Sequence, residues 1–463
     1  MRIDVGARVR ISNPSKTVID WCEKELTIAN PEYAKKKRMG FWTGGTPATI
    51  CLYEWNGNTL VVPFGCLETL LNKTDTKYEL TSNFGKSKIV WYGADIPLYD
   101  YQKKAVSKML DVGYGILQSA AGSGKTQMGL AIAIILGRRT LWLTHTHDLL
   151  QQSMDRALQY IDKDLIGTIT EGKVNIGKGI TFATVQTMCN LDLDLYRDNW
   201  DCIIVDECHR VAGTPMSVTQ FSHVLNHLAA RFKYGLSATV HRADGMIKAT
   251  YALLGPVAYA VPDEAVADKV MQVTVRPQYT NIGLDPAYLD TDGTIIYAKL
   301  INYLCDNFER NCIISLDLIA NQDHSNLILS DRLAHLKWLM DDLPPELKKK
   351  AVMIDGKMTS KKAKAEREQA IEDMRTGKKK YLFASYRLAK EGLDIPCLDR
   401  LYLTTPQKDS AVIIQCIGRI ARTFEGKDTP VCYDYVDGKV QMLMKMFKKR
   451  CTSYRKKKCI IEK

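Results

Sequence analysis

Two series of short apolar segments, separated by amphipathic stretches, most constrain what this sequence can fold into. The first series covers residues 115–118, 140–144, 180–183, 202–205 and 234–237, and the second covers residues 326–329, 351–354, 380–384, 400–404 and 431–436. Apolar runs of this length that alternate with helical patterns predict parallel strands joined by crossover helices. We therefore expect an α/β protein with two parallel-sheet lobes.

The segment before these lobes, residues 1–95, predicts a small β-rich domain. Asn56-Gly57-Asn58 lies between the apolar segments 49–55 and 59–64. Asn-Gly in such a position predicts a β-hairpin, because both residues tolerate positive φ. We place the two lobes at residues 96–262 and 263–447, expect residues 262–300 to join them, and expect a basic tail at residues 448–463.

The composition is that of a globular protein in a reducing compartment. The 463 residues carry a formal net charge of +12, which favours a polyanionic partner about as strongly as it favours a generally basic surface. The 13 cysteines include no CxxC pair, which argues against a zinc or iron–sulfur site. The first residues are charged where a signal peptide needs an apolar run, and the apolar stretch 130–136 is too short to span a bilayer. We expect a cytoplasmic protein without a membrane segment.

A phosphate-binding loop is predicted where the first apolar segment ends. Residues 119–126 read Ser-Ala-Ala-Gly-Ser-Gly-Lys-Thr and precede a helical run at 127–136. Small residues let backbone N–H groups point at phosphate oxygens, and a helix N-terminus favours negative charge. Lys125 can reach the phosphates and Thr126 can ligate Mg²⁺, whereas Ser119 replaces the usual first glycine; the alternative is a glycine-rich turn that binds nothing. The residues expected to bind nucleotide are Gly122, Ser123, Gly124, Lys125 and Thr126.

Two acids follow the fourth apolar segment. Asp206 and Glu207 come directly after residues 202–205, in the sequence Asp-Glu-Cys-His. A strand that ends in two carboxylates suits a magnesium site with a catalytic base, in which Asp206 holds Mg²⁺ and Glu207 orients and deprotonates the attacking water. Alone, the pair is also what an acidic surface turn would give. Together with the phosphate loop, it predicts ATP hydrolysis with Mg²⁺ as cofactor.

The ordered motifs resemble those of superfamily 2 helicases, which have two RecA-like lobes that share an ATP site. Residues 206–209 match the DExH box, and Ser237-Ala-Thr239 resembles motif III, which couples the ATP site to the nucleic acid. Gln102 resembles an upstream glutamine that reads adenine. Residues 239–245, with Arg242, resemble a segment of XPB-type and UvsW-type enzymes. Residues 144–149 resemble motif Ia, although the family usually has Pro-Thr there. The resemblance assigns nucleic-acid contacts to Thr144, Thr170, Gly172, Thr184 and Gln186.

The second lobe carries the remaining motifs. Residues 415–422 match motif VI, and if they are helical, Gln415, Arg419 and Arg422 share a face. The resemblance implies that this face directs both guanidinium groups at the γ-phosphate of ATP. Surface arginines on a helix are the alternative when motif VI is considered by itself. Residues 382–396 closely resemble motif V, in which the family uses Ser385, Glu391 and Gly392 toward nucleic acid and Asp394 toward the ribose.

Two further clusters have no assigned role in this set. Lys35 to Arg38, followed by Phe41 and Trp42, could grip a phosphate backbone and stack on bases, and a solvated basic loop explains them equally well. His145 and His147 have no carboxylate or thiolate partners in the sequence pattern, so we interpret them as variants within motif Ia.

The resemblance covers residues 98–440 and implies an ATP-dependent DNA helicase or translocase. It would act on branched or duplex DNA in replication, recombination or repair, with fork reversal or branch migration as candidate activities. The rival interpretations are a DExH RNA helicase, the motor subunit of a restriction-type complex, and a binding module with a relic ATP fold. The last is disfavoured because Lys125, Asp206, Glu207 and Arg422 are all present. We expect a monomeric or weakly associating protein, in the host cytoplasm if a phage encodes it.

Overall fold

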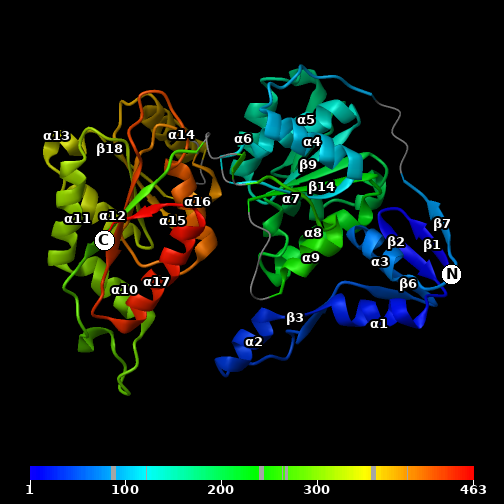
Figure 1. Ribbon diagram of the computed structural model, residues 1–463, viewed down its shortest axis with the longest axis horizontal. Helices are drawn as coiled ribbons and strands as arrows, with labels where there is room; N and C mark the ends of the chain where they lie inside the picture. Colours follow the sequence, from blue (N-terminus) through cyan, green and yellow to red (C-terminus); the bar gives the residue numbers. More distant parts are fainter. Residues whose placement is uncertain are drawn as a thin grey trace. The chain divides into compact units, whose positions relative to one another are not determined.

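The computed structural model describes residues 1–84, 90–120, 122–238, 245–262, 264–265, 270–355, 361–393 and 395–462. The chain forms two compact units, Met1–Val266 and Ala267–Lys463. The first unit contains the N-terminal domain and one α/β lobe, and the second contains the other α/β lobe (Figure 1). The predicted fold class, two parallel-sheet lobes preceded by a small β-rich domain, is confirmed.

A five-stranded sheet in the order β5-β6-β2-β1-β7 forms the N-terminal domain. Its strands are β1 (Arg2–Val5), β2 (Arg8–Ser12), β5 (Glu54–Asn56), β6 (Thr59–Pro63) and β7 (Glu79–Ser82), and its helices are α1 (Lys16–Glu25) and α3 (Leu67–Lys73). The predicted hairpin is confirmed, because β5 pairs antiparallel with β6 and Gly57 in the turn has a φ of +57°.

A separate two-stranded sheet in this domain carries a basic helix. β3 (Thr27–Ala29) pairs antiparallel with β4 (Thr49–Cys51), and α2 (Pro31–Arg38) lies between them in the chain. The apolar run 49–55, predicted as one strand, is therefore split between two sheets, because its first residues pair with β3 and its last with β6. We call residues 27–51 the arm. None of the eight residues of α2 is buried.

An eight-stranded sheet forms the first lobe, in the order β11-β10-β12-β9-β13-β14-β8-β15. All neighbours pair parallel except β10 with β11. The strands are β8 (Tyr114–Gln118), β9 (Thr140–Thr144), β10 (Ile166–Thr170), β11 (Lys173–Asn175), β12 (Ile180–Thr184), β13 (Cys202–Asp206), β14 (Phe232–Ser237) and β15 (Val257–Ala260). The helices include α4 (Asp100–Val112), α5 (Lys125–Leu136), α6 (His147–Ala157), α7 (Val185–Cys189), α8 (Pro215–His227) and α9 (Ile247–Leu254). The five strands predicted for this lobe are all present, within two residues of the expected bounds.

The N-terminal domain packs directly on the first lobe. Side chains of α8 and α9 complete its apolar core, and the backbones come close together: a Cβ at Gly65 would lie 2.2 Å from the backbone nitrogen of Gly255. Across the same contact, the buried ammonium group of Lys233 in β14 donates a hydrogen bond to the Ala7 carbonyl at 3.0 Å. Burial lowers the pKa of Lys233 to about 7. The domain and the lobe therefore form one folded unit.

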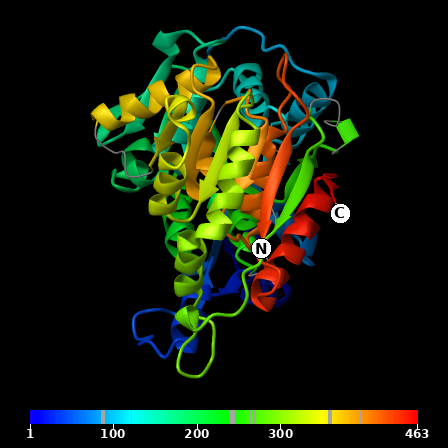
Figure 2. The same ribbon diagram turned by 90° about the vertical axis from the view of Figure 1, so that its left-hand side faces the viewer.

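A seven-stranded parallel sheet forms the second lobe, in the order β18-β19-β17-β20-β21-β16-β22. Figure 2 shows its strands side by side with helices packed over them. The strands are β16 (Thr274–Tyr279), β17 (Asn326–Ser330), β18 (Ala351–Ile354), β19 (Tyr381–Ser385), β20 (Arg400–Leu403), β21 (Val431–Val436) and β22 (Ile460–Ile461). The helices include α10 (Tyr297–Asp306), α11 (Phe308–Ala320), α12 (Leu333–Asp341), α13 (Pro345–Lys348), α14 (Lys361–Arg375), α15 (Tyr386–Gly392), α16 (Ser410–Ile420) and α17 (Gln441–Lys456).

Two stretches that the sequence places outside the second sheet belong to it. Residues 262–300 are predicted to join the lobes, yet they contain β16, which pairs with β21 over six residues. Residues 448–463 are predicted to be a basic tail, but they form the end of α17 and strand β22. Arg450 in α17 makes two hydrogen bonds of 2.8 Å to the buried carboxylate of Asp434. This pairing offsets the cost of burying both charges, so the basic segment can pack on the sheet.

Most of the cysteines are buried in the cores of the two units. All 13 are free, and the buried ones are Cys22, Cys66, Cys202, Cys208, Cys305, Cys416, Cys432 and Cys451. Their burial agrees with the prediction that they act as small core side chains. Among the helices that the structure describes, none has the length and hydropathy needed to cross a membrane.

Candidate active site

The carboxyl ends of the parallel strands bring the predicted residues of the first lobe to one edge of the sheet. In the register of the sheet, Ser237 lies beside Gln118 at the start of the phosphate loop, and Asp206 lies beside Leu236. On the other side of β13, Thr144 lies beside Thr184. Ligands of open parallel sheets bind at this edge, because the loops that follow the strands meet there.

The phosphate loop, residues 119–126, connects β8 to the first turn of α5. Gly124 precedes the helix with a φ of +79°, a left-handed conformation that disfavours residues with a Cβ. The hydroxyl groups of Ser119 and Ser123 lie 2.5 Å apart, and Ser123 Oγ also donates to the Ala120 carbonyl at 2.7 Å. The backbone N–H of Ser119 donates to the Ser237 carbonyl at 3.0 Å. The loop is thus tied to motif III, while Ala121 lies outside the described residues.

Gln102 supports this loop from α4. Its Nε2 donates to the Ser123 carbonyl at 2.9 Å, and the hydroxyl of Tyr101 donates to the same carbonyl at 3.0 Å. Its Oε1 accepts from the backbone N–H of Tyr99 at 2.9 Å. A Cβ at Gly124 would lie 2.4 Å from Gln102 Nε2. The side chain expected to read adenine is therefore buried, with both ends of its amide bonded to main chain.

Asp206 ends β13 as a buried carboxylate, with 5% of its surface exposed. Its Oδ1 accepts from the backbone N–H of Glu207 at 2.9 Å, and its Oδ2 accepts from Ser153 Oγ of α6 at 3.2 Å. Burial and the neighbouring Glu207 raise its pKa to about 6, although Lys125 acts in the opposite direction. Such a carboxylate, short of compensating positive charge, fits a divalent cation. Thr126, in the first turn of α5, is the second residue predicted to hold it.

Glu207 has a left-handed backbone conformation, and His209 links its side chain to motif III. Its φ and ψ are +48° and +49°, a conformation that costs a side-chain-bearing residue free energy and is frequent at functional sites. His209 Nδ1 lies 3.2 Å from Glu207 Oε2 and 3.1 Å from Ser237 Oγ. The contacts of His209 with Glu207 and Ser237, and of Ser153 with Asp206, are not predicted by the spacing of the DExH box.

The residues expected to contact nucleic acid lie further along the same edge. Thr144 is buried at the end of β9, and Thr184 ends β12 as the N-cap residue of α7, with its hydroxyl donating to Thr187 Oγ1 at 2.9 Å. Gln186 Nε2 donates to the His145 carbonyl at 2.9 Å, which joins the loops after β9 and β12. Thr170 ends β10, and Gly172, with a φ of +75°, forms the turn into β11. Thr239 and Arg242 lie outside the described residues.

In the second unit, motif V lies on strand β19 and on helix α15, which follows it. Ser385 caps α15, because its hydroxyl accepts from the backbone N–H of Leu388 at 3.4 Å. Glu391 and Gly392 are the last two residues of that helix. Asp394 lies outside the described residues.

Motif VI departs from the predicted helix. α16 ends at Ile420, so Gln415 and Arg419 share a face while Arg422 lies beyond the helix. The prediction that all three share one helical face is therefore wrong, because Ala421 caps the helix and Arg422 forms a bridge with Val270. Gln415 is buried.

Arg419 joins motif VI to motif V. Its Nε donates to the Ala389 carbonyl at 2.9 Å, and its Nη1 donates to the Leu393 carbonyl at 3.1 Å. Two of its donors thus fix the end of α15, a structural contact in addition to the predicted role toward phosphate.

Two known domain families match the parts of the chain that contain this site. Residues 95–242 match the model described as type III restriction enzyme, res subunit, and residues 309–424 match the helicase conserved C-terminal domain. This chain carries both domains of a superfamily 2 helicase. The two matched domains contain the phosphate loop, the acids and motif VI, and they make the protein an ATP-hydrolysing helicase.

Relatives of the helicase support this assignment. A "putative ATP-dependent RNA helicase" of Acanthamoeba polyphaga mimivirus is 27% identical over 421 residues, which cover 89% of this chain and 77% of the relative. The DNA 3'-5' translocase XPB2 of Sulfurisphaera tokodaii is 26% identical over 359 residues, which cover 71% of this chain and 79% of the translocase. The structure of the ATP-dependent type ISP restriction-modification enzyme LlaBIII bound to DNA has a TM-score of 0.54 at 17% identity; the match covers 78% of this chain and 30% of that one and indicates a shared fold.

Proposed function

We propose that this helicase couples ATP hydrolysis to movement along, and remodelling of, branched or duplex DNA. The observation that carries the proposal is the shared edge of the first sheet. The phosphate loop is hydrogen-bonded to Ser237 there, and Glu207 is linked to Ser237 through His209. Thr144 and Thr184 lie further along the same edge. A change at the ATP site can therefore be transmitted to the nucleic-acid residues through Ser237.

The chemistry of hydrolysis is assigned to the residues of the loop and the DExH box. Lys125 contacts the phosphates, and Glu207 orients the attacking water and takes its proton. Asp206 and Thr126 would hold Mg²⁺, which neutralises phosphate charge and is consistent with the raised pKa of the Asp206 carboxyl. Replacing Lys125 with Ala, or Glu207 with Gln, should abolish hydrolysis. A parent rate in either variant would disprove the assignment.

The arginines of motif VI are proposed to stabilise the negative charge of the transition state. In related NTPases an arginine finger is worth roughly 10³ or more in rate. Arg422→Ala should therefore lower kcat steeply and leave nucleotide affinity nearly unchanged. Arg419→Ala should also lower kcat, and it should loosen α15 in addition, because Arg419 donates to the Ala389 and Leu393 carbonyls.

DNA is the proposed substrate, and RNA is the principal alternative. The archaeal relative is named a DNA translocase and the mimivirus relative an RNA helicase, so the names support either polymer. ATPase rates should be compared with single-stranded DNA, duplex DNA, forks, Holliday junctions and RNA duplex at one salt concentration. Stimulation by branched or duplex DNA well above that by RNA supports the proposal; stimulation by RNA alone would contradict it.

A second candidate function is the motor subunit of a restriction-type complex, which the description of the first matched family favours. We propose instead that the chain works as a monomer or a weakly associating protein, in a reducing cytoplasm that suits its 13 free cysteines. A native mass near 52.2 kDa together with DNA-stimulated ATPase supports an independent enzyme. Activity only in a stable complex with other subunits would favour the motor-subunit interpretation.

The arm is proposed to contact single-stranded or opened DNA. Trp42 is 82% exposed and Phe41 62% exposed, and both follow the lysines of α2. Base stacking on an exposed aromatic ring and phosphate contact with lysine are the usual means of sequence-tolerant binding. Trp42→Ala should weaken DNA binding by about tenfold. Tyr92→Ala, at a site of similar exposure (79%), is the matched control. Equal effects of both variants would exclude a specific role for the arm.

A further inference from the structure

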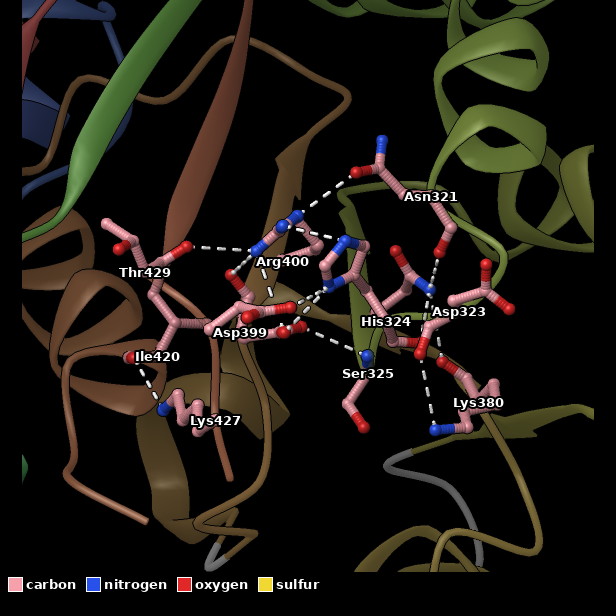
Figure 3. A network of polar contacts seen from close by, with 12 residues as sticks. Asn321, Asp323, His324, Ser325, Lys380, Asp399, Arg400, Ile420, Lys427 and Thr429 are labelled. Carbon is pink, nitrogen blue, oxygen red and sulfur yellow. Dashed lines mark hydrogen bonds and ion pairs between the residues drawn. The ribbon is translucent and has the colours of Figure 1, made fainter. Parts of the chain in front are cut away.

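Lys427 follows motif VI and binds the main chain around it. Its Nζ donates to the Ile420 carbonyl at 2.7 Å (Figure 3). It also donates to the carbonyls of Arg422 at 2.7 Å and Pro396 at 3.1 Å. Three acceptors match the three N–H donors of an ammonium group. Ile420 ends α16, and a positive charge near a helix C-terminus interacts favourably with the carbonyl groups exposed there.

These acceptors belong to the two motifs that are proposed to act on ATP. Pro396 is the last residue of the motif V stretch, and Ile420 and Arg422 lie within motif VI. Arg419 joins the same two motifs through the Ala389 and Leu393 carbonyls. Lys427 thus binds the carbonyl of Arg422 and the carbonyl of Ile420, the residue directly after Arg419. The matched C-terminal helicase domain ends at residue 424, before Lys427.

A buried polar network holds the loop that carries Lys427. Arg400 Nη1 donates to the Thr429 carbonyl at 3.0 Å (Figure 3). His324 Nδ1 lies 2.9 Å from Asp399 Oδ2 and 3.5 Å from Asp428 Oδ2. Asp399 is itself held by the backbone N–H of Ser325, which donates to its Oδ1 at 3.0 Å. Asp428 and Thr429, the two residues that follow Lys427, are therefore held by His324, in the turn before β17, and by Arg400 of β20.

The same network could be taken for a cation site, because His324, Asp399 and Asp428 place three possible ligand atoms within 4.8 Å of one another. Arg400 argues against this. Its Nη2 lies 2.8 Å from His324 Nε2, and a guanidinium group can only donate. The lone pair of the neutral ring is then on Nε2, and the Nδ1 that faces the two carboxylates carries the proton. A nitrogen in that state donates hydrogen bonds and does not ligate a metal.

We propose that Lys427 is a positioning residue for ATP hydrolysis, which fixes the main chain on which Arg419 and Arg422 are presented. This inference rests on the proposed role of the two arginines. The His324–Asp399–Arg400 network supports it by holding the two residues after Lys427 beside β20. Loss of the Lys427 ammonium should therefore lower the rate of hydrolysis without changing the affinity for nucleotide.

The protonation state of Lys427 gives an independent readout. Burial lowers its pKa to about 8, against the opposing effects of Asp399 and Cys397, and Arg422 lowers it further. Asp399, Cys397 and Arg422 are the neighbouring groups that shift the pKa of Lys427, and His324, Glu425 and Asp428 line the same hollow. Above this pH the amine keeps only two N–H donors for three carbonyls. We therefore expect kcat to fall above about pH 8 as Lys427 loses its proton. An arginine at position 427 would keep its charge over this pH range.

The experiment compares Lys427→Met and Lys427→Arg with Lys439→Met, an exposed lysine of the same unit. The measurements are kcat of DNA-stimulated ATPase between pH 6.5 and 9.5, affinity for a non-hydrolysable ATP analogue, and the melting temperature. Lys427→Met should lower kcat about tenfold at unchanged nucleotide affinity, and Lys427→Arg should restore it without the fall above pH 8. Lys439→Met should match the parent.

Three results would overturn the proposal. They are a parent kcat in Lys427→Met, a loss that Lys427→Arg does not restore, and a loss accompanied by an equal loss of nucleotide affinity. If Lys427→Met does not fold, the pH profile of Lys427→Arg decides: a missing fall above pH 8 supports the proposal and an unchanged fall overturns it. Failure of the proposed function is recognised separately, since Arg422→Ala would then keep the parent rate.

Discussion

Replacing Asp206 with Asn should stabilise the protein while it abolishes hydrolysis. Asp206 is buried, and its pKa is raised from 3.8 to about 6 by burial and by Glu207. The folded state therefore holds the proton more tightly than the unfolded state, so stability falls as pH rises from about 4 through 6 and stays low above it. A pKa rise of about two units corresponds to about 3 kcal/mol of folding stability lost at neutral pH. Asn carries no charge; its Oδ1 can still accept from the Glu207 N–H, and its Nδ2 can donate to Ser153 Oγ.

Urea unfolding in EDTA, followed by tryptophan fluorescence, measures this difference. Six of the seven tryptophans lie in the first unit, since only Trp338 belongs to the second, so the signal reports mainly on the unit that contains Asp206. At pH 7.5 the Asp206→Asn variant should be more stable by about 1–3 kcal/mol, and the gain should shrink toward pH 5. Asp111→Asn, at an exposed carboxylate, should show no gain. An Asp206→Asn variant that is no more stable than the parent at pH 7.5, or whose gain is the same at all pH values, would refute the reasoning.

Three further substitutions test other contacts. Gly124→Ala should weaken ATP-analogue binding about tenfold in a fluorescence titration, because its φ of +79° and the approach of Gln102 Nε2 leave no room for a Cβ; parent affinity would argue against the loop conformation. His209→Ala should reduce the stimulation of ATPase by DNA about tenfold with basal ATPase little changed, and retained stimulation would exclude coupling through this residue. Gly65→Ala should destabilise the first unit by about 1–3 kcal/mol in urea, because its Cβ would meet the Gly255 backbone, and an unchanged midpoint would show that the two backbones can separate.

Sequence reasoning identified the strands and the first-lobe edge because the physical signal there is local. A strand buried on both faces reads as a continuous apolar run, and the ten predicted strands lie within two residues of the observed ones. The Gly-Ser-Gly-Lys-Thr segment follows one of them directly, so its position at the carboxyl edge of the sheet follows from topology.

The missed features depend on contacts between distant residues. β16 contains Pro277 and alternates polar with apolar residues, so it lacks the apolar run that marks the other strands. The basic end of the chain folds because Arg450 pairs with Asp434, a partner that no local pattern reveals. The left-handed conformation of Glu207 and the end of α16 before Arg422 likewise have no marker in the local sequence pattern.

The most direct test of the account is strand separation coupled to ATP hydrolysis on a forked DNA. The parent should release the displaced strand only with ATP and Mg²⁺, with hydrolysis stimulated by the fork, and Lys125→Ala should show neither activity while it still folds. Fork-independent hydrolysis together with no movement or strand displacement on any DNA would contradict the proposal that this helicase is a DNA motor.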